Sequence, residues 1–392
     1  MSDFDWITGF EKFMQDAESP DRFIRWSAIA AVSAVAQRKI WLEFGDLTFY
    51  PNFYIILIGP PATRKGTAIR PARNFVDFVG IPMCANSITR EKFIIRLENS
   101  ANCFEKGNAL VTHCSLAIWA EELSTLIGKY NEQLVKDLTE LYDCGETFKY
   151  ETKNMGDNAI GGVFVTWLGA TTPESFRTLI PQDAIGTGLS SRMLFVCATR
   201  KRKKSLFPNF TRTAEGIQLD QELKSFLTEL YGVAGNFTMS SKFFKAYTSC
   251  YGQMPDDCPF DPQHFAHYWD RRAQHLLKLS MVLALSRGAG IRGNPLVLKE
   301  NDFERALSYL EDIEQDMPYA YSSAGRAKEA YILNKVMIRV KIGGEVYYSD
   351  LLSELIRDTN ERELTAVIMS LEKIGVLKTF ETGKGLLLRW VK

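Results

Sequence analysis

The sequence has no excess of charge of either sign. Its 392 residues contain 47 Lys and Arg and 47 Asp and Glu, which gives a formal net charge of zero. Proteins that coat nucleic acid through bulk charge are strongly basic, so this class is excluded, although a local basic site is not. Hydrophobic residues make up 46% and charged residues 24%, which is typical of a globular protein and excludes a disordered tail or a fibrous repeat.

The sequence also lacks long apolar runs and a cysteine framework. The run 53–58 is far shorter than the roughly 20 residues that cross a bilayer. No charged and apolar leader precedes a cleavage site, so we expect a cytoplasmic protein without membrane contact. The seven cysteines are odd in number and never form a CxxC pair, which indicates reduced, mostly buried thiols and argues against disulfides or a zinc knuckle.

Apolar spacing predicts the order of helices and strands. Residues 5–38 repeat large apolar side chains at helical spacing, and from residue 53 short apolar runs alternate with helical patterns. The predicted strands are 53–58, 116–119, 163–168 and 193–198, and the predicted helices between them are 65–79 and 123–143. This alternation is typical of an α/β protein with a parallel sheet.

The remainder of the chain predicts two further regions. Residues 206–322 lose the strand pattern and are predicted to be helical. Residues 323–392 then predict a helix, a short strand, two helices and a β-ribbon with a basic tip, the order of elements in a winged helix. We therefore expect four parts: a helical segment 1–50, a core 51–205, a helical region 206–322 and a winged-helix domain 323–392.

A candidate phosphate-binding loop directly follows the first strand and opens a helix. It reads Gly59-Pro60-Pro61-Ala62-Thr63-Arg64-Lys65-Gly66-Thr67. Such a loop wraps backbone N–H groups around a phosphate at a helix N-terminus, with a lysine on the phosphate oxygens and a hydroxyl on Mg²⁺. Lys65 would supply the charge, and Thr67 would supply the hydroxyl because Gly66 stands where the hydroxyl residue is usual. Arg64 also stands where a glycine is usual. The alternative is a Gly- and Pro-rich turn without a ligand.

The second strand ends in two adjacent carboxylates. Leu116 to Ala120 is followed by Glu121 and Glu122. Adjacent acids at the end of a strand can divide the work, with Glu121 holding Mg²⁺ or its water and Glu122 polarising the attacking water. Glutamates in a first helical turn would give the same pattern, because acids are favoured there.

Polar residues also border the third and fourth strands. The third strand is followed by Thr171-Thr172-Pro173, and Thr172 could orient the lytic water if its strand lies between the other two. Ser190-Ser191-Arg192-Met193 comes immediately before the fourth strand.

Taken together, residues 50–315 resemble the AAA+ ATPases. The resemblance is to the helicase branch with the minichromosome maintenance and superfamily 3 helicases and related phage replication ATPases. It implies a P-loop NTPase core with a parallel sheet, a helical lid and a C-terminal winged helix. Thr172 would then be the first sensor, Arg192 the finger that reaches a neighbour's ATP, and Arg271, within 271–280, the second sensor of the lid.

The resemblance implies a ring-forming DNA motor that uses ATP and Mg²⁺. We expect a homo-oligomer of six subunits, a replicative helicase of phage or mobile-element type that acts with other replication proteins in the host cytoplasm. Single-stranded DNA would pass through the pore and contact a hairpin at 148–160, where Lys149 and Lys153 share one face, and Lys384 in the wing would touch DNA. A solvated hairpin is the alternative.

Three other functions remain open. The fold could serve a helicase loader or protein remodeller, with the winged helix as a docking module. The sequence Lys65-Gly66-Thr67 also fits a small-molecule phosphotransferase. A non-catalytic DNA-binding protein that holds nucleotide structurally is the third.

Overall fold

The chain folds as a mixed α/β protein whose sheets contain parallel strands. The computed structural model describes residues 4–128, 131–152, 156–179, 188–205, 213–321, 327–356, 359–383 and 385–391. The predicted α/β class is thus confirmed at this level. In the described part of the chain, no helix combines the length and the apolar character that crossing a membrane requires.

The centre of the molecule is a five-stranded sheet. Its strands, in spatial order, are β4 (Ala101–Lys106), β5 (Ala109–Ala120), β8 (Val163–Thr171), β3 (Tyr54–Ile58) and β9 (Met193–Cys197). β5, β8, β3 and β9 run parallel, and β4 pairs with β5 in the antiparallel direction. Every residue of β3, β8 and β9 is buried, which explains their continuous apolar runs, because helices cover both faces of such a sheet.

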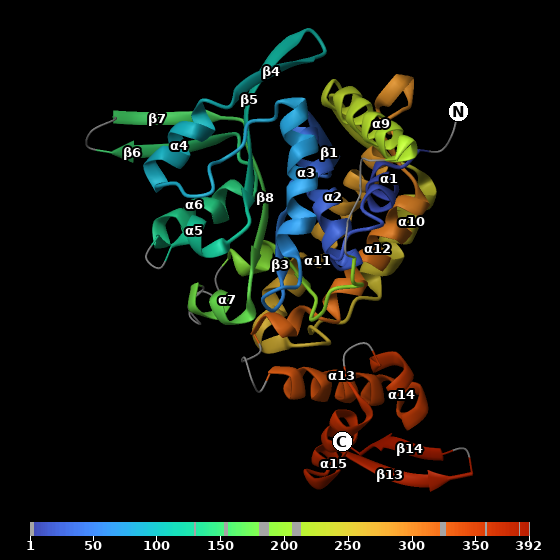
Figure 1. Cartoon of the computed structure of the whole chain (residues 1–392). Coiled ribbons are helices and arrows are strands. Elements are labelled where there is room, and N and C mark those ends of the chain that lie inside the picture. Colours follow the sequence, from blue (N-terminus) through green and yellow to red (C-terminus); the bar gives the residue numbers. More distant parts are fainter. Residues whose placement is uncertain are drawn as a thin grey trace.

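Helices lie on both sides of this sheet, as Figure 1 shows. On one side lie α2 (Asp21–Ala36) and α3 (Lys65–Val79), and on the other lie α5 (Leu123–Ile127) and α6 (Glu132–Leu141). Of the 16 residues of α2, 13 are buried. A helix that is apolar all round belongs inside a protein, and α2 is enclosed by the sheet, α3 and α1 (Trp6–Phe13).

The predicted helix at 123–143 is wrong as a single element, because the chain breaks between α5 and α6. Gly128 ends α5 with a φ of 61°, in the left-handed region where glycine is favoured. Asn131 then starts α6 with a side-chain cap on the backbone N–H of Leu134. The other predicted elements of the core are present, although β5 extends beyond its apolar run to pair with β4.

A second sheet joins two segments for which the sequence predicted helices only. Its order is β11 (Val297–Leu298), β10 (Gly235–Met239), β1 (Ile40–Phe44) and β2 (Leu47–Phe49). β1 pairs with β10 in parallel, so residues 40–42 and 235–237 form one ladder. These strands are only two to five residues long, and such short pieces carry no clear period in the sequence.

Four long helices build the region after the central sheet. They are α9 (Ala214–Tyr231), α10 (Ser241–Gly252), α11 (Pro262–Ser286) and α12 (Glu300–Glu314). An ion pair that is almost fully buried joins α11 to α12, with Arg272 Nε 2.6 Å from Glu314 Oε1. The hydroxyl of Tyr268 donates to the same carboxylate oxygen, so the buried charge is well satisfied.

The C-terminal elements form a separate cluster below the rest of the molecule in Figure 1. They are α13 (Ala327–Gly343), β12 (Glu345–Tyr347), α14 (Tyr348–Leu355), α15 (Glu361–Lys373), β13 (Leu377–Thr382) and β14 (Gly385–Trp390). The three strands form an antiparallel sheet in the order β12-β14-β13. Lys335 of α13 ties the cluster to the body, with Nζ 3.0 Å from Asp316 Oδ1.

One lysine lies buried between α11 and the sheet. The side chain of Lys278 donates to Asn52 Oδ1 at 2.8 Å, and its Nζ lies 3.9 Å from the centre of the Tyr142 ring. Burial without a contacting carboxylate disfavours the charged form and lowers the pKa of Lys278 to about 8. The unfolded chain therefore binds this proton more tightly than the folded chain does.

Replacing Lys278 by methionine should reveal this cost through its pH dependence. Between pH 8 and the ordinary lysine pKa of about 10.5, the unfolded state binds more protons, so wild-type stability gains from Lys278 as the pH rises. Lys278→Met lacks this gain. The difference in free energy of unfolding, variant minus wild type, should fall by roughly 2 to 3 kcal/mol from pH 7 to pH 10.

Urea unfolding at several pH values measures this difference. Lys245→Met is a matched control, because Lys245 lies exposed on α10 and its removal should leave the pH profile unchanged. Parallel profiles for wild type and Lys278→Met would show that Lys278 is not held at a cost.

Candidate functional site

The loop 59–67 lies between a buried strand and the start of a helix, the position that the sequence predicts. It connects the end of β3 to the first residue of α3, so the N-terminus of a 15-residue helix points into it. Ala62 and Arg64 have φ angles of 67° and 63°, in the left-handed region. Arg64 thus adopts the backbone that glycine usually provides at this position, and a neighbouring contact has to hold it there.

The connection between α1 and α2 provides that contact. Ser19 Oγ donates to the carbonyl oxygen of Arg64 at 3.0 Å, and Arg64 Nε donates to Glu18 Oε2 at 2.6 Å. Glu18 also accepts from Lys201 Nζ at 2.6 Å and from the backbone N–H of Ser205 at 3.1 Å. The Lys201 hydrogen bond, followed by those from Ser205 and Arg64, lowers the pKa of Glu18 to about 2. One carboxylate therefore joins the loop to the segment after β9.

Lys65 folds back into the loop it is predicted to serve. Its Nζ donates to the carbonyl oxygens of Gly59 at 2.7 Å and Pro60 at 3.0 Å. Burial lowers the pKa of Lys65, and the charge of Glu122 opposes this shift. The ammonium group sits where a phosphate in the loop would meet it, and phosphate oxygens would replace the carbonyls as its partners.

Glu121 and Glu122 follow β5 and point to different neighbours. Glu121 faces α3, where Arg70 holds it in a bidentate pair: Nε lies 2.9 Å from Oε1, and the terminal nitrogen lies 2.8 Å from Oε2. Glu122 precedes α5, is exposed, and accepts from Ser124 Oγ at 3.3 Å. The two carboxylates are therefore not equivalent, and Glu121 is the one that reaches the helix of the loop.

Thr172 lies at the C-terminal ends of the parallel strands, as the loop does. β8 runs between β5 and β3, as expected from the sequence, and the carbonyl of Thr171 accepts from the backbone N–H of Gly59 at 3.3 Å. Thr172 Oγ1 accepts from the backbone N–H of Ser175 at 3.2 Å and caps α7 (Pro173–Leu179). The hydroxyl therefore already has a structural role next to the loop.

Arg192 and Arg271 lie at the opposite, N-terminal ends of the parallel strands. Arg192 precedes β9, whose first residue pairs with the first residue of β3, so Arg192 is one length of β3, about 17 Å, from the loop. Both arginines bind the half-exposed carboxylate of Asp143. Arg192 forms an ion pair with it and also donates to Gly188 O at 2.7 Å, and Arg271 lies 3.5 Å from Asp143 Oδ1. The structure thus separates these two residues from the others.

The basic run 200–204 packs against the N-terminal helices. Arg202 donates to the carbonyl oxygens of Met14, Gln15 and Ala17, which close the C-terminal end of α1. A cation at a helix C-terminus is favourable because the carbonyls there lack partners within the helix. Lys203 lies 3.4 Å from Asp16. Much of the positive charge of this run is therefore neutralised within the chain.

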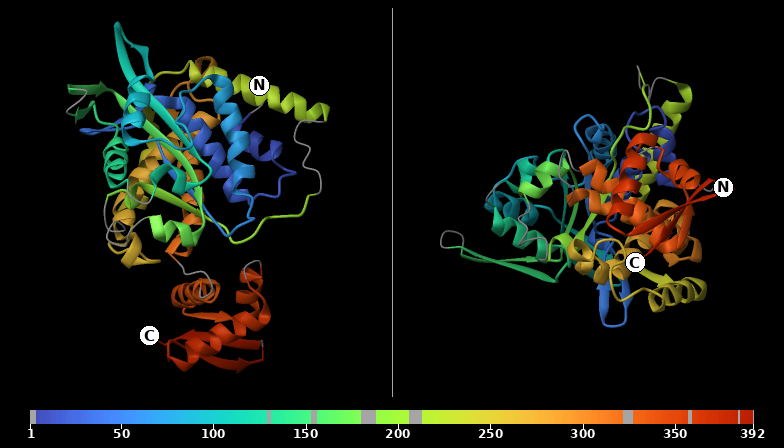
Figure 2. Two further views of the ribbon diagram at one scale, coloured as in Figure 1. Left: turned by 60° about the vertical axis from the view of Figure 1, so that its left-hand side comes forward. Right: turned by 90° about the horizontal axis from the view of Figure 1, so that it is seen from below.

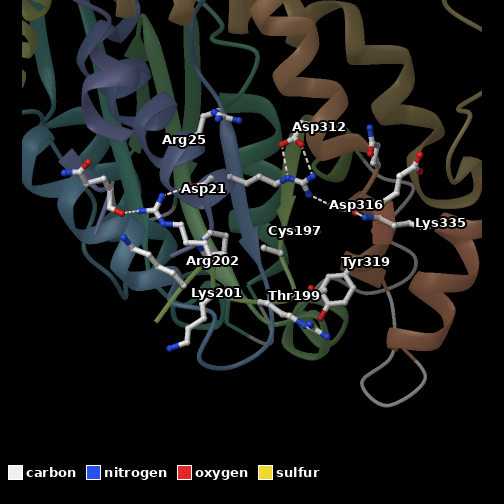
Figure 3. Close-up of a pocket in the computed structure, with 18 residues that line it drawn as sticks. Asp21, Arg25, Cys197, Thr199, Lys201, Arg202, Asp312, Asp316, Tyr319 and Lys335 are labelled. Atoms are coloured by element: carbon white, nitrogen blue, oxygen red, sulfur yellow. Dashed lines mark hydrogen bonds and ion pairs between the residues drawn. The ribbon is translucent and has the colours of Figure 1, made fainter. Parts of the chain in front are cut away.

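A cavity of about 880 Å³ lies beside the basic run. Figure 3 shows that its walls come from the α1–α2 connection, the segment after β9, the end of α12, and α13. Arg22 pairs there with Asp312 and Asp316. The loop residues 60–67, all of which the structure describes, do not line this cavity. The cavity therefore borders the candidate phosphate site without containing it.

The predicted hairpin at 148–160 is present. β6 (Thr147–Thr152) and β7 (Gly156–Gly161) pair in the antiparallel direction, with Lys149 opposite Ala159. Phe148, Tyr150 and Ile160 are buried, and Lys149 is exposed. In Figure 2 the two strands extend away from the body. Two predicted DNA contacts, Lys153 and Lys384, lie outside the described residues.

The candidate site offers few metal ligands of its own. Among the described residues, no group of three His, Cys, Asp or Glu side chains could hold a metal ion. Mg²⁺ in nucleotide sites takes one or two carboxylates and completes its shell with phosphates and water. Glu121 Oε2 lies 2.9 Å from where a Cβ on Gly66 would be, in the first turn of α3, and Thr67 is the next residue, so Glu121 and Thr67 are the residues that would hold such an ion.

No protein-family model matches the chain, and no curated protein matches its sequence.

Three residues that contact the predicted site residues are not predicted from the sequence. Arg70 has a local signal, because it follows Gly66 by four residues and shares its face of α3. Glu18 and Asp143 have none, since each meets its partners across more than 40 residues.

Gly59 allows a close approach that a larger residue would prevent. A Cβ at this position would lie 2.6 Å from the carbonyl oxygen of Ala198, in the backbone after β9. Gly59→Ala should therefore destabilise the protein by roughly 1 to 3 kcal/mol, since backbone has to move. Urea unfolding measures the effect. Gly145→Ala is the matched control, because its nearest neighbour atom is 3.9 Å away. Equal stability of the two variants would contradict the close contact.

Proposed function

We propose that the protein is an ATP-dependent, ring-forming DNA motor, a replicative helicase of the phage or mobile-element type. The observation that carries this proposal is the division of the predicted site between two edges of one sheet. The C-terminal ends of the parallel strands carry Lys65, Glu121, Glu122 and Thr172, and both predicted arginines lie at the N-terminal ends. A complete site then needs the N-terminal ends of the strands in one subunit to meet the C-terminal ends in the next.

The residues at the C-terminal ends of the strands support nucleotide hydrolysis. Lys65 would contact the phosphates at the N-terminus of α3, and Mg²⁺ held by Glu121 and Thr67 would neutralise their charge. Glu122 would polarise the attacking water, and Thr172 would orient it. The order of strands supports the AAA+ resemblance as well, because the strand before Thr172 lies between the strands that end at the glutamates and at the loop.

The arginines at the N-terminal ends of the strands support action on a neighbouring subunit. Arg192 and Arg271 both bind the half-exposed Asp143, so the two guanidinium groups are close together, although only 10% of the Arg192 side chain is exposed. A guanidinium contributed in trans stabilises the charge that develops on a transferring phosphoryl group. On this proposal, the finger leaves Asp143 when a neighbour's nucleotide competes for it. Head-to-tail contacts of this kind form a ring when the rotation between neighbouring subunits closes.

The β6–β7 hairpin is the element that would contact single-stranded DNA in the pore. Its apolar residues anchor it to the body and leave Lys149 exposed. One lysine from each subunit gives a ring of positive charge, which binds phosphates independently of sequence. The zero net charge of the chain is compatible with this, since only the pore has to be basic.

The C-terminal cluster supports a winged-helix assignment but also a second function. Two helices, α14 and α15, followed by the ribbon β13–β14 give the expected order of elements. However, the first turn of α15 contains Glu361 and Glu363, and Met369 and Ile374 near its end are 64% and 66% exposed. A helix with this surface favours a protein partner over DNA. The second candidate is therefore a helicase loader or remodeller without unwinding activity.

Two substitutions at the C-terminal ends of the strands test the ATPase proposal. Lys65→Ala should abolish DNA-stimulated ATP hydrolysis by removing the phosphate contact, and Glu122→Gln should reduce turnover about 100-fold or more while nucleotide binding remains. Steady-state ATPase assays with and without single-stranded DNA, and strand displacement on a forked duplex, measure both activities. Normal turnover in both variants would overturn the motor. Turnover without strand displacement would favour the loader.

The trans arrangement is tested by mixing two inactive variants. Lys65→Ala lacks the loop lysine, and Arg192→Ala lacks the finger, so each homogeneous ring should be inactive. In an equal mixture, about a quarter of the interfaces combine an intact loop with an intact finger, and ATPase activity should recover to about that fraction. Mixed rings as inactive as their parents would place both residues in one subunit's site.

A further inference from the structure

A positively charged side chain of α3 already binds Glu121, the predicted metal ligand. Arg70, one turn into α3, holds Glu121 with three hydrogen bonds of 2.8 to 3.0 Å. Bidentate guanidinium–carboxylate pairs are the strongest and most directional of the ion pairs. The pair occupies the carboxylate that Mg²⁺ would need.

Gly66 makes room for this pair. A Cβ at position 66 would lie 2.9 Å from Glu121 Oε2 and 3.8 Å from a terminal nitrogen of Arg70. A serine or threonine at 66 would therefore collide with the carboxylate in its observed position. Gly66 and Arg70 are four residues apart on one face of the helix, so the missing hydroxyl and the added guanidinium belong to one arrangement. The guanidinium lies next to the place that a hydroxyl ligand on residue 66 would take.

We infer that Arg70 is a built-in competitor of the metal ion: it holds Glu121 in the nucleotide-free subunit and has to leave before Mg²⁺ binds there. This inference rests on the proposed nucleotide site and deepens it. Glu121 alone is a poor ligand set for Mg²⁺, and Arg70 makes it poorer. A nucleotide changes the balance because its phosphates supply further oxygen ligands to the ion. Metal binding at Glu121 is thus coupled to nucleotide binding.

The surroundings of Arg70 allow the release that this inference requires. Its side chain is 70% exposed and that of Glu121 is 31% exposed, so the guanidinium can turn into solvent without opening the core. Because both side chains reach solvent, water screens even this well-aligned pair, and a divalent ion with phosphate ligands can replace it. The pair is a competitor that yields, and it is not a permanent lock.

Metal affinity gives a direct test without relying on turnover. Binding of Mn²⁺ is measured by electron paramagnetic resonance, with the protein alone and with ADP. Arg70→Met should bind Mn²⁺ about tenfold more tightly than wild type, because a unit charge next to the ion has been removed. Arg70→Lys, which keeps the charge, should lie close to wild type. Circular dichroism checks that the variants are folded.

Two further variants separate competition from a general charge effect. Arg73→Met removes the same charge from the same helix, where the side chain contacts Asn86, and should leave Mn²⁺ affinity within twofold. Adding Glu121→Gln to Arg70→Met should abolish the gain.

Unchanged or weaker Mn²⁺ binding by Arg70→Met overturns the inference, as does a gain that survives Glu121→Gln. If ADP makes no difference in any variant, the proposed nucleotide site fails instead. The measurements without ADP still report whether Arg70 competes for Glu121.

Discussion

The complete burial of three parallel strands is the constraint on which the rest of the structure depends. β3, β8 and β9 have no exposed face, so their direction and register are set by the helices on both sides. Because β5 runs parallel to them, the residues after these strands meet at one edge and the residues before them at the other. This burial brings Lys65, Glu121 and Thr172 together and keeps Arg192 apart from them.

The edge that carries the loop is held by charge as well as by packing. Glu18 links Arg64 of the loop to Lys201 after β9, and Arg202 closes α1 from the same segment. The α1–α2 connection is therefore part of the loop's support, although it lies more than 40 residues earlier in the chain. A change in this connection would be felt at the loop through one carboxylate, since Glu18 contacts both partners directly.

Local patterns in the sequence predict most of the core and little of its support. Apolar runs locate β3, β5, β8 and β9. The loop directly follows β3 and the glutamates directly follow β5, so their common position at the C-terminal ends of the strands is predictable. The short strands β1, β2, β10 and β11 are missed because two to five residues carry no clear period. The break at Gly128 is missed because apolar spacing continues across it. Asp143 has no signal, since its partners are distant in sequence and only the fold brings them together.

The two departures from the phosphate-loop pattern have different physical consequences. Arg64 adopts a left-handed backbone conformation that glycine takes more easily, and the Ser19 and Glu18 contacts offset the strain. Gly66 changes the chemistry, because the space it leaves admits the Glu121 carboxylate and brings a guanidinium next to it. Under the proposed function, the Glu18 contact holds the loop in its observed conformation, and the Arg70 pair controls the access of a metal ion to Glu121.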